Sequence, residues 1–293
     1  METVAVIGLG IMGGPMAANL LKTGFDVVGY NRTPSKVQAL VDAGGRRAGS
    51  VAEAVRDADV IITVLPDSPD VEAVTTGEDG IIAHARRGAL YIDMSTIRPD
   101  VSVRVADAGR RAGLRVLDAP VSGGEAGAVE GSLSIMVGGE PDDFAAAQPV
   151  FEAVGTTIVH VGPAGSGQTV KAANQLIVAG HIGLLAEAIV FLEAHGVDGA
   201  AALEVLGGGL AGSTVLSRKG ASMLAREFEP GFRLALHHKD LGIVQSAARA
   251  AGVVTPLGAV VAQLVAAMVA RGDGGLDHSG LLRLVDELSG RAG

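Results

Sequence analysis

Hydrophobic and polar positions divide the chain into two parts that differ in periodicity. Up to about residue 162, short runs rich in Val, Ile and Leu alternate with stretches of helical periodicity. The early runs are almost continuously apolar, which indicates strands buried on both faces, as in a parallel sheet covered by helices. This pattern predicts a doubly wound α/β domain. The runs that predict strands are residues 3–7, 26–30, 59–65, 89–93, 114–120, 133–139 and 156–161.

After residue 162 the alternation stops. The turn-rich segment GPAGSG is followed by helical stretches separated by GVDG, GGGLAGS, EPGF and RGDGG, and we find no further strand pattern. The first of these helices is expected from about 167 to 195, which is roughly 40 Å at 1.5 Å per residue. We therefore expect an α/β domain over residues 1–163 and an all-helical domain over residues 164–293, joined by this long helix.

One apolar segment is almost long enough to cross a membrane. VVTPLGAVVAQLVAAMVA, residues 253–270, contains no charged residue, and its length is close to the lower limit for a bilayer-spanning helix. Thr255 and Pro256 are typical of an N-cap followed by Pro at the first helical position. We expect a helix that is buried in a core or a subunit interface, because an apolar helix needs cover. A homo-dimer or homo-tetramer is therefore expected.

Composition and charge exclude several functions. The 23 basic and 32 acidic residues give a formal net charge of -9 and form no blocks, so no nucleic-acid surface is expected. The absence of cysteine excludes disulfides and thiolate chemistry. The histidines lack metal-ligand spacing, and the adjacent His237 and His238 must point in different directions, so we expect no metal. The N-terminus shows no export signal, which leads us to expect a cytoplasmic protein.

The loop after the first predicted strand has the pattern of a dinucleotide site. In VAVIGLGIMGGPMAANLLKTG, three glycines have GxGxxG spacing between a strand and a helix. Gly8 permits a tight turn, Gly10 lets the backbone approach a pyrophosphate, and Gly13 allows close helix packing. Amides at the helix N-terminus bind phosphate charge. The spacing alone is weak evidence, but its context favours nucleotide binding over a structural loop. The expected contacts are Gly8, Leu9, Gly10, Ile11, Met12 and Gly13.

The end of the second strand bears on the choice of cofactor. Sites that prefer NAD usually have an acidic residue there, whereas this chain has Asn31, Arg32 and Thr33. The planar donors of Arg32 suit a 2′-phosphate, so NADP(H) is favoured, with NAD(H) possible. The alternative is an arginine that is simply solvated.

Later strands should also end at the cofactor, since ligands of such sheets bind at their carboxyl edge. This predicts contacts from Leu65 and Pro66 after the third strand, and from Ser95 and Thr96 after the fourth. Thr96 is the preferred candidate for the ribose or the nicotinamide. The two hydroxyl residues are also suited to capping the helix that starts near Pro99.

A single lysine marks the start of the long helix. In GSGQTVKAANQ, no other Asp, Glu, Lys or Arg accompanies Lys171 between Glu152 and Glu187. Lys171, Asn174 and Gln175 project from one helix face. Such a lysine is either a surface residue or a functional cation in a cleft, and the two amides favour the cleft.

A glycine-rich turn follows the fifth strand. Ser122, Gly123 and Gly124 offer a hydroxyl and backbone amides that can hold a small anion such as a substrate carboxylate. A flexible linker is the alternative. No G-x-S-x-G motif is present, so hydrolase chemistry has little support.

The residues described above resemble those of the β-hydroxyacid dehydrogenases over the entire chain. The similarity is carried by GLGIMGGPMAANLL, DAPVSGGEAGAVEGSLSIMVGG, GSGQTVKAANQ and HHKDLGI. The segments GGGLAGSTVL, PGFRLALHHKDL and DHSGLLRL look like the tartronate semialdehyde reductase branch, also called 2-hydroxy-3-oxopropionate reductases. This resemblance implies a Rossmann domain followed by a helical domain.

The resemblance also implies roles for individual residues. Lys171 would be the general acid and base, with Asn174 as a second catalytic residue. Ser122, Gly123, Gly124 and Lys239 would contact the substrate. Lys239 and Thr96 would also contact the cofactor, and Asp240 would support Lys239. Some members carry an acidic residue where this chain has Asn31, a departure that affects cofactor choice.

The function expected from the resemblance is the reversible reduction of tartronate semialdehyde to D-glycerate by hydride transfer from NAD(P)H. The alternatives are a 3-hydroxyisobutyrate dehydrogenase and a reductase of glyoxylate or succinic semialdehyde. A nucleotide-binding interaction module without activity is a third possibility, because a fold does not fix a function.

Overall fold

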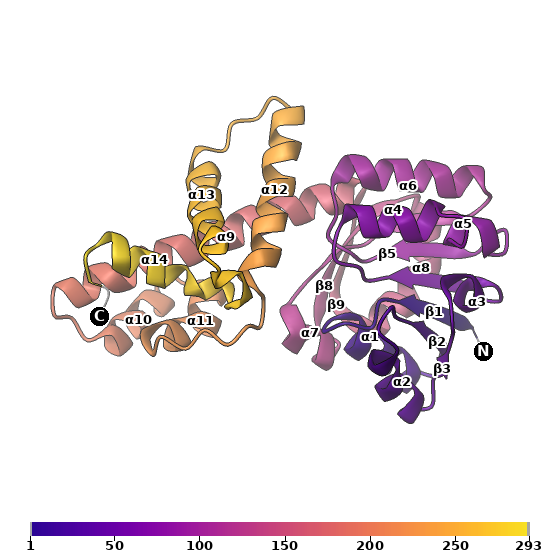
Figure 1. The fold of residues 1–293 in the computed structure, drawn as a ribbon, viewed down its shortest axis with the longest axis horizontal. Coiled ribbons are helices and arrows are strands. Elements are labelled where there is room, and N and C mark those ends of the chain that lie inside the picture. Colours follow the sequence, from indigo (N-terminus) through magenta and orange to yellow (C-terminus); the bar gives the residue numbers. More distant parts are fainter. Residues whose placement is uncertain (1, 292–293) are drawn as a thin grey trace. The chain divides into compact units, whose positions relative to one another are not determined.

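The computed structural model describes residues 2–291 (Figure 1). The chain divides into two compact units, the first ending at Lys171 and the second beginning at Ala172. The first unit therefore ends later than the expected boundary at residue 163. The difference arises because the first turn of the long helix is hydrogen-bonded to the sheet of the N-terminal unit, through contacts described below.

The N-terminal unit contains a nine-stranded sheet and its covering helices. Its strands are β1 (Thr3–Ile7), β2 (Asp26–Tyr30), β3 (Arg46–Arg47), β4 (Val60–Thr63), β5 (Leu90–Asp93), β6 (Arg115–Asp118), β7 (Val121–Ser122), β8 (Leu133–Gly139) and β9 (Gly155–Gly162). Its helices are α1 (Gly13–Lys22), η1 (Pro34–Val37), α2 (Gln38–Asp42), α3 (Val51–Val55), α4 (Ser68–Thr76), α5 (Ile81–His84), α6 (Pro99–Arg111), α7 (Gly124–Glu130) and α8 (Pro141–Val154).

The sheet has the strand order β3-β2-β1-β4-β5-β6-β8-β7, and β9 pairs with β8. The first six strands are parallel, as the apolar runs predict. Beyond these strands the sheet is mixed, since β8 runs antiparallel to both β6 and β7 and parallel to β9. The pattern missed β3 and β7, because two-residue strands are too short to show a periodicity.

Both faces of the sheet are buried. Along β1, Val4 and Val6 belong to one hydrophobic cluster, while Ala5 and Ile7 belong to the other. The first cluster includes residues of α1 and α8, and the second includes residues of α3, α4 and α6. This alternation explains why the early strands are apolar at every position.

The carboxyl ends of the central strands lie in one row. Ile7 pairs with Thr63, Thr63 with Asp93, and Asp93 with Asp118. The strand order reverses direction between β1 and β4, which is the point where sheets of this type bind their ligands. A ligand site is therefore expected at the loops that follow these strands.

The C-terminal unit is helical apart from one isolated bridge between Arg233 and Asp277 in the part that is described. It begins within α9 (Ser166–Ala194), whose observed bounds differ by one residue at each end from those expected. The other helices are α10 (Gly199–Gly208), α11 (Thr214–Leu224), α12 (Leu234–Ala250), α13 (Pro256–Ala270), η2 (Asp273–Gly275), η3 (His278–Gly280) and α14 (Leu281–Leu288).

Helix α9 is a core helix of this unit. Ala179 and Ile182 pack in one cluster with residues of α12 and α13, and Ala186 and Ile189 pack in a second with residues of α10 and α11. By length and composition alone, α9 is the one helix among the described residues that could cross a membrane. Its packing against other helices accounts for its apolar character.

The apolar segment at residues 253–270 is only partly buried. Helix α13 begins at Pro256 as predicted, and its buried residues are Gly258, Val265 and Met268. Leu257 is 79% exposed and Val260 is 60% exposed. The expectation of a buried helix is thus met on one face, and the other face is open within this chain.

Candidate functional site

The loop between β1 and α1 requires glycine at two of its three motif positions for reasons within the chain. Gly8 has a φ of 101°, and a Cβ there would lie 2.2 Å from the carbonyl oxygen of Val64. A Cβ on Gly13 would lie 1.9 Å from the carbonyl oxygen of Gly8. A Cβ on Gly10 would meet nothing within 4 Å. The glycine at position 10 leaves open space above the loop, which fits the close approach of a dinucleotide pyrophosphate.

The N-terminus of α1 is electrostatically suited to a phosphate group. No side chain within the described residues caps it, and no acidic residue occupies its first turn. The helix is ten residues long, so its amide dipoles add up toward this end. The loop and the helix terminus are together suited to bind the phosphate groups of a dinucleotide.

Asn31 fixes the loop after β2 to the glycine-rich loop. Its Oδ1 accepts a hydrogen bond from the Leu9 amide at 3.0 Å, and its Nδ2 donates to the carbonyl oxygen of Thr33 at 3.1 Å. The neighbouring Arg32 is 77% exposed and forms an ion pair with Asp70 of α4, with 3.3 Å between Nη2 and Oδ1. Sequence reasoning missed Asp70, since nothing in the spacing connects α4 with the end of β2.

Ser95 joins the loops after β4 and β5. Its Oγ accepts a hydrogen bond from the Leu65 amide at 2.9 Å, and its side chain is buried. It does not cap α6, because that helix has Arg98 at the N-cap position and no side-chain cap. Thr96 is partly exposed beside it. The structure thus brings the predicted cofactor residues of four strand ends together, through the Asn31–Leu9 and Ser95–Leu65 contacts.

A buried polar network underlies these loops. Thr63 Oγ1 donates to Asp93 Oδ1 at 2.7 Å and lies 3.1 Å from the hydroxyl of Tyr91, which in turn contacts Thr75. Burial raises the pKa of Asp93 to about 6, and the charge of Asp118 acts in the same direction. Asp93 Oδ2 is buried without a hydrogen-bond partner among the described residues. This carboxyl group was not predicted as a site residue.

Two buried side chains fix the first turn of α9 to the sheet edge. Asp118 accepts hydrogen bonds from the amides of Gly165 and Gln168, at 2.7 and 2.9 Å. Gln168 accepts from the Ile97 amide at 3.0 Å and donates to the Ser95 carbonyl at 2.8 Å. Gln168 therefore contacts the backbone on both sides of Thr96, although no motif or spacing in the sequence singles it out.

Lys171 follows Gln168 by three positions, so both lie on the same face of the first turns of α9. Its side chain is buried, with 7% exposed. A solvated surface lysine would be far more exposed, so Lys171 is not a surface residue of that kind. Its helix begins at the carboxyl edge of the sheet, beside the loops that carry the predicted cofactor residues.

The turn at Ser122 has a backbone that only glycine adopts easily. Ser122 ends β7, and Gly123 and Gly124 follow with φ values of 138° and 65°. Helix α7 starts at Gly124. Side chains other than glycine would strain this turn, so its backbone conformation requires both glycines.

The C-terminal unit connects four polar residues in a chain of contacts. Asn174 donates to Gln175 at 2.8 Å, and Gln175 donates to Asp240 Oδ2 at 2.6 Å. Lys239 pairs with Asp240 Oδ1 at 2.8 Å. The local support of Lys239 by Asp240 is thus present as expected. Gln175, which is absent from the predicted set of site residues, is the link between Asn174 and Asp240.

The two adjacent histidines have different environments. His237 is buried and its Nδ1 lies 3.1 Å from Nδ1 of His278, while His238 is exposed. Burial lowers the pKa of His278 to about 3, and repulsion from His237 adds to this effect. His278 is therefore neutral at physiological pH, and the pair is a hydrogen-bonded part of the core. No group suited to a metal ion was found among the described residues.

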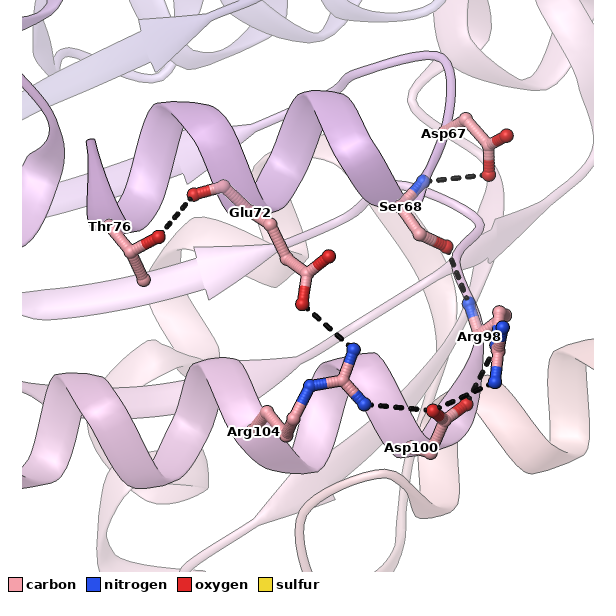
Figure 2. Close-up of polar contacts among 7 residues, drawn as sticks. All are labelled: Asp67, Ser68, Glu72, Thr76, Arg98, Asp100 and Arg104. Atoms are coloured by element: carbon pink, nitrogen blue, oxygen red, sulfur yellow. Dashed lines mark hydrogen bonds and ion pairs between the residues drawn. The ribbon is translucent and has the colours of Figure 1, made fainter.

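Helices α4 and α6, which follow the loops at Leu65 and Ser95, are connected at the surface (Figure 2). Arg104 of α6 reaches Glu72 of α4 at 2.8 Å and Asp100 at 2.8 Å. At the other end, the Arg98 amide donates to Ser68 Oγ at 3.1 Å. These contacts hold the two helices that carry the cofactor-edge loops.

Comparisons with known proteins find matches to both parts of the chain. The model for the NAD binding domain of 6-phosphogluconate dehydrogenase matches residues 3–162, and that for the NAD-binding domain of NADP-dependent 3-hydroxyisobutyrate dehydrogenase matches residues 165–285. The chain is 40% identical to 2-hydroxy-3-oxopropionate reductase from Escherichia coli, over 96% of each chain. It is 38% identical to NAD-dependent L-serine dehydrogenase from Pseudomonas aeruginosa, over 99% of this chain and all of the other.

A solved structure has the same fold. The 3-hydroxyisobutyrate dehydrogenase of Mycobacterium tuberculosis, determined with L-serine, is 35% identical and has a TM-score of 0.88, covering 97% of this chain and 99% of that one. The fold and the site define an NAD(P)-dependent oxidoreductase with a Rossmann domain and a helical domain. The chain belongs to the β-hydroxyacid dehydrogenase family.

Proposed function

We propose that this enzyme reversibly reduces tartronate semialdehyde, 2-hydroxy-3-oxopropanoate, to D-glycerate, with Lys171 as general acid and base. The observation that carries the catalytic part is the buried Lys171, one turn beyond a helix start that Asp118 and Gln168 fix to the cofactor edge. The 40% identity to a 2-hydroxy-3-oxopropionate reductase supports the choice of substrate.

The chain's own residues have defined tasks in this proposal. The reduced nicotinamide supplies a hydride to the aldehyde carbon. The ammonium group of Lys171 donates a proton to the aldehyde oxygen as it becomes an alcohol, and the neutral amine accepts that proton in the reverse reaction. The turn at Ser122, Gly123 and Gly124 binds the substrate carboxylate, together with Lys239, and Asn174 orients the substrate oxygen.

A second candidate is the oxidation of L-serine or 3-hydroxyisobutyrate. Two relatives at comparable identity, one named for L-serine and one solved with it, favour this candidate. D-glycerate, L-serine and 3-hydroxyisobutyrate all carry a hydroxyl on carbon 3, and they differ at carbon 2 in a hydroxyl, an ammonium or a methyl group. The reacting carbon is the same in all three, so the group at carbon 2 decides between the candidates.

Steady-state kinetics with a substrate panel tests the proposal. We expect the highest kcat/KM with tartronate semialdehyde and, in reverse, with D-glycerate, followed by 3-hydroxyisobutyrate, L-serine, glyoxylate and succinic semialdehyde. A site that hydrogen-bonds a substrate hydroxyl discriminates strongly against an analogue that lacks it. A preference for L-serine or 3-hydroxyisobutyrate would instead support the second candidate, and no turnover of any compound would contradict both.

We further propose that NADPH is preferred to NADH, since Arg32 stands where a 2′-phosphate binds and no acidic residue takes the place of Asn31. The same kinetic assay with both cofactors measures this preference. A higher kcat/KM with NADH would contradict it.

We propose that the enzyme is a homo-oligomer located in the cytoplasm. Ile177, Leu184 and Phe191 recur every seven residues along α9 and are 56%, 64% and 64% exposed, so a second copy has an apolar helix face to cover. Light scattering should show a dimer or tetramer at micromolar concentration and a smaller species for Leu184→Lys. The matched control Val129→Lys, at a 55% exposed valine of α7, should leave the mass unchanged. A monomeric wild type would contradict the proposal.

A further inference from the structure

The ion pair between Arg32 and Asp70 leaves the arginine available to a ligand. The Arg32 side chain is 77% exposed, the Asp70 side chain 28%, and the two nearest atoms are 3.3 Å apart. An exposed pair at this distance contributes little to stability, because both charges are well solvated and screened by salt. The guanidinium group also has donors beyond the single Nη2 contact, which suits bidentate binding of a phosphate.

The residues around Arg32 suit the binding of a phosphate, except for the negative charge of Asp70. Asn31 turns its side chain back to the Leu9 amide and the Thr33 carbonyl, so the side chain of Asn31 is committed to holding the loop. Thr33, Ser35 and Lys36 are exposed on the same segment. These groups attract a phosphate. Asp70 lies on helix α4, and its carboxylate is paired with Arg32, the principal cation of this segment.

We propose that Asp70 is a specificity-determining residue, whose carboxylate weakens the binding of the 2′-phosphate of NADP(H) and leaves the binding of NAD(H) unchanged. The inference rests on the proposed role of Arg32 in NADP(H) binding. A phosphomonoester carries roughly 1.5 to 2 negative charges at neutral pH. Asp70 partly neutralises the cation that attracts this phosphate and repels the phosphate directly. NAD(H) has no charge at this position and is not affected.

Binding measurements on Asp70→Asn test the inference without any knowledge of the substrate. Titration of NADPH and NADH, followed by nicotinamide fluorescence, should give a Kd for NADPH about three- to tenfold lower than that of the wild type at low salt. The Kd for NADH should stay within experimental error. The gain for NADPH should shrink as ionic strength rises, because the Debye length falls from about 30 Å at 0.01 M to about 8 Å at 0.15 M.

Glu72→Gln is the matched control. It removes one negative charge from the same helix, and the carboxylate of Glu72 accepts a hydrogen bond from Arg104 of α6 (Figure 2). Its Kd for NADPH should equal that of the wild type. An equal gain in both variants, an equal change for NADH, or weaker NADPH binding by Asp70→Asn would each overturn the inference.

A separate variant distinguishes failure of the inference from failure of the proposed cofactor preference. Arg32→Ala should raise the Kd for NADPH and leave that for NADH unchanged. An unchanged Kd for NADPH in Arg32→Ala would show that the 2′-phosphate does not bind there, and the proposed NADP(H) preference would fall together with the inference. A raised Kd in Arg32→Ala, with no gain in Asp70→Asn, would overturn the role of Asp70 alone.

Discussion

At the scale of single residues, the buried carboxyl group of Asp93, at the carboxyl end of β5, destabilises the folded protein when it is ionised. Its side chain is buried beneath the loops that carry Leu65 and Ser95, and it accepts hydrogen bonds from Thr63 and from the Ser95 amide. Burial raises its pKa from the usual 3.8 to about 6. Because the folded protein holds this proton more tightly than the unfolded chain, the folded state loses stability as pH rises from about 4 to 6.

Asp93→Asn should therefore change the pH dependence of stability. The rise in pKa from 3.8 to about 6 corresponds to about 3 kcal/mol of folding free energy that the wild type loses on going from below pH 4 to above pH 6. Relative to wild type, the variant should gain stability by about this amount over that interval. Urea unfolding at several pH values measures the difference. Asp79→Asn, at a 94% exposed side chain, is the control, and parallel curves for wild type and Asp93→Asn would contradict the expectation.

The same scale shows which site residues a sequence can reveal. Gly8 and Gly13 were predictable, because a turn and a close backbone contact require glycine at fixed spacing. Asp70 and Gln168 were not, since their partners are 38 and 71 to 73 positions away in the chain, and no periodicity encodes such contacts.

At the scale of elements, the first turn of α9 is held in place by Gln168. This residue bonds the backbone on both sides of Thr96, and it precedes Lys171 by one turn of the same helix. A rigid connection of this kind keeps the lysine at a fixed distance from the loop after β5. Displacement of a catalytic group by about 1 Å is enough to lower a rate about a hundredfold.

Gln168→Leu should lower kcat by about ten- to a hundredfold and leave the Kd for NADPH nearly unchanged. Hydride transfer should become more rate-limiting, so the deuterium isotope effect with 4-deuterated NADPH should rise. Thr169→Val is the control, since the hydroxyl of Thr169 donates to the Gly165 carbonyl at the start of the same helix. An unchanged kcat and isotope effect, or an equal loss in Thr169→Val, would show that Gln168 has no positioning role.

The limits of sequence reasoning at this scale follow from element length. The strands at residues 3–7, 26–30 and 133–139 were predicted with their observed bounds, since runs of five to seven residues are long enough to show a pattern. The direction of β8 was not predictable, because the pairing partner of a strand depends on long-range packing. The first unit ends at Lys171 because hydrogen bonds at Gln168 join the start of α9 to the sheet. A change in composition along the sequence cannot reveal such bonds.

At the scale of the whole molecule, the change in periodicity near residue 162 indicates the change from an α/β unit to a helical unit. The proposed contacts to the cofactor phosphates lie in the α/β unit, and Asn174 and Lys239, the proposed substrate contacts, lie in the helical unit. The substrate was not predictable to the same depth. Relatives named for 2-hydroxy-3-oxopropionate and for L-serine have similar identity to this chain, so overall similarity does not select the substrate.

The central claim is that Lys171 transfers the proton that accompanies hydride transfer, and the kinetics of Lys171→Ala test it most directly. Loss of a general acid should lower kcat by about a hundred- to ten-thousandfold, while the Kd for NADPH stays near that of the wild type. Added methylamine should restore part of the turnover by taking the place of the missing amine. A kcat close to that of the wild type would contradict the account.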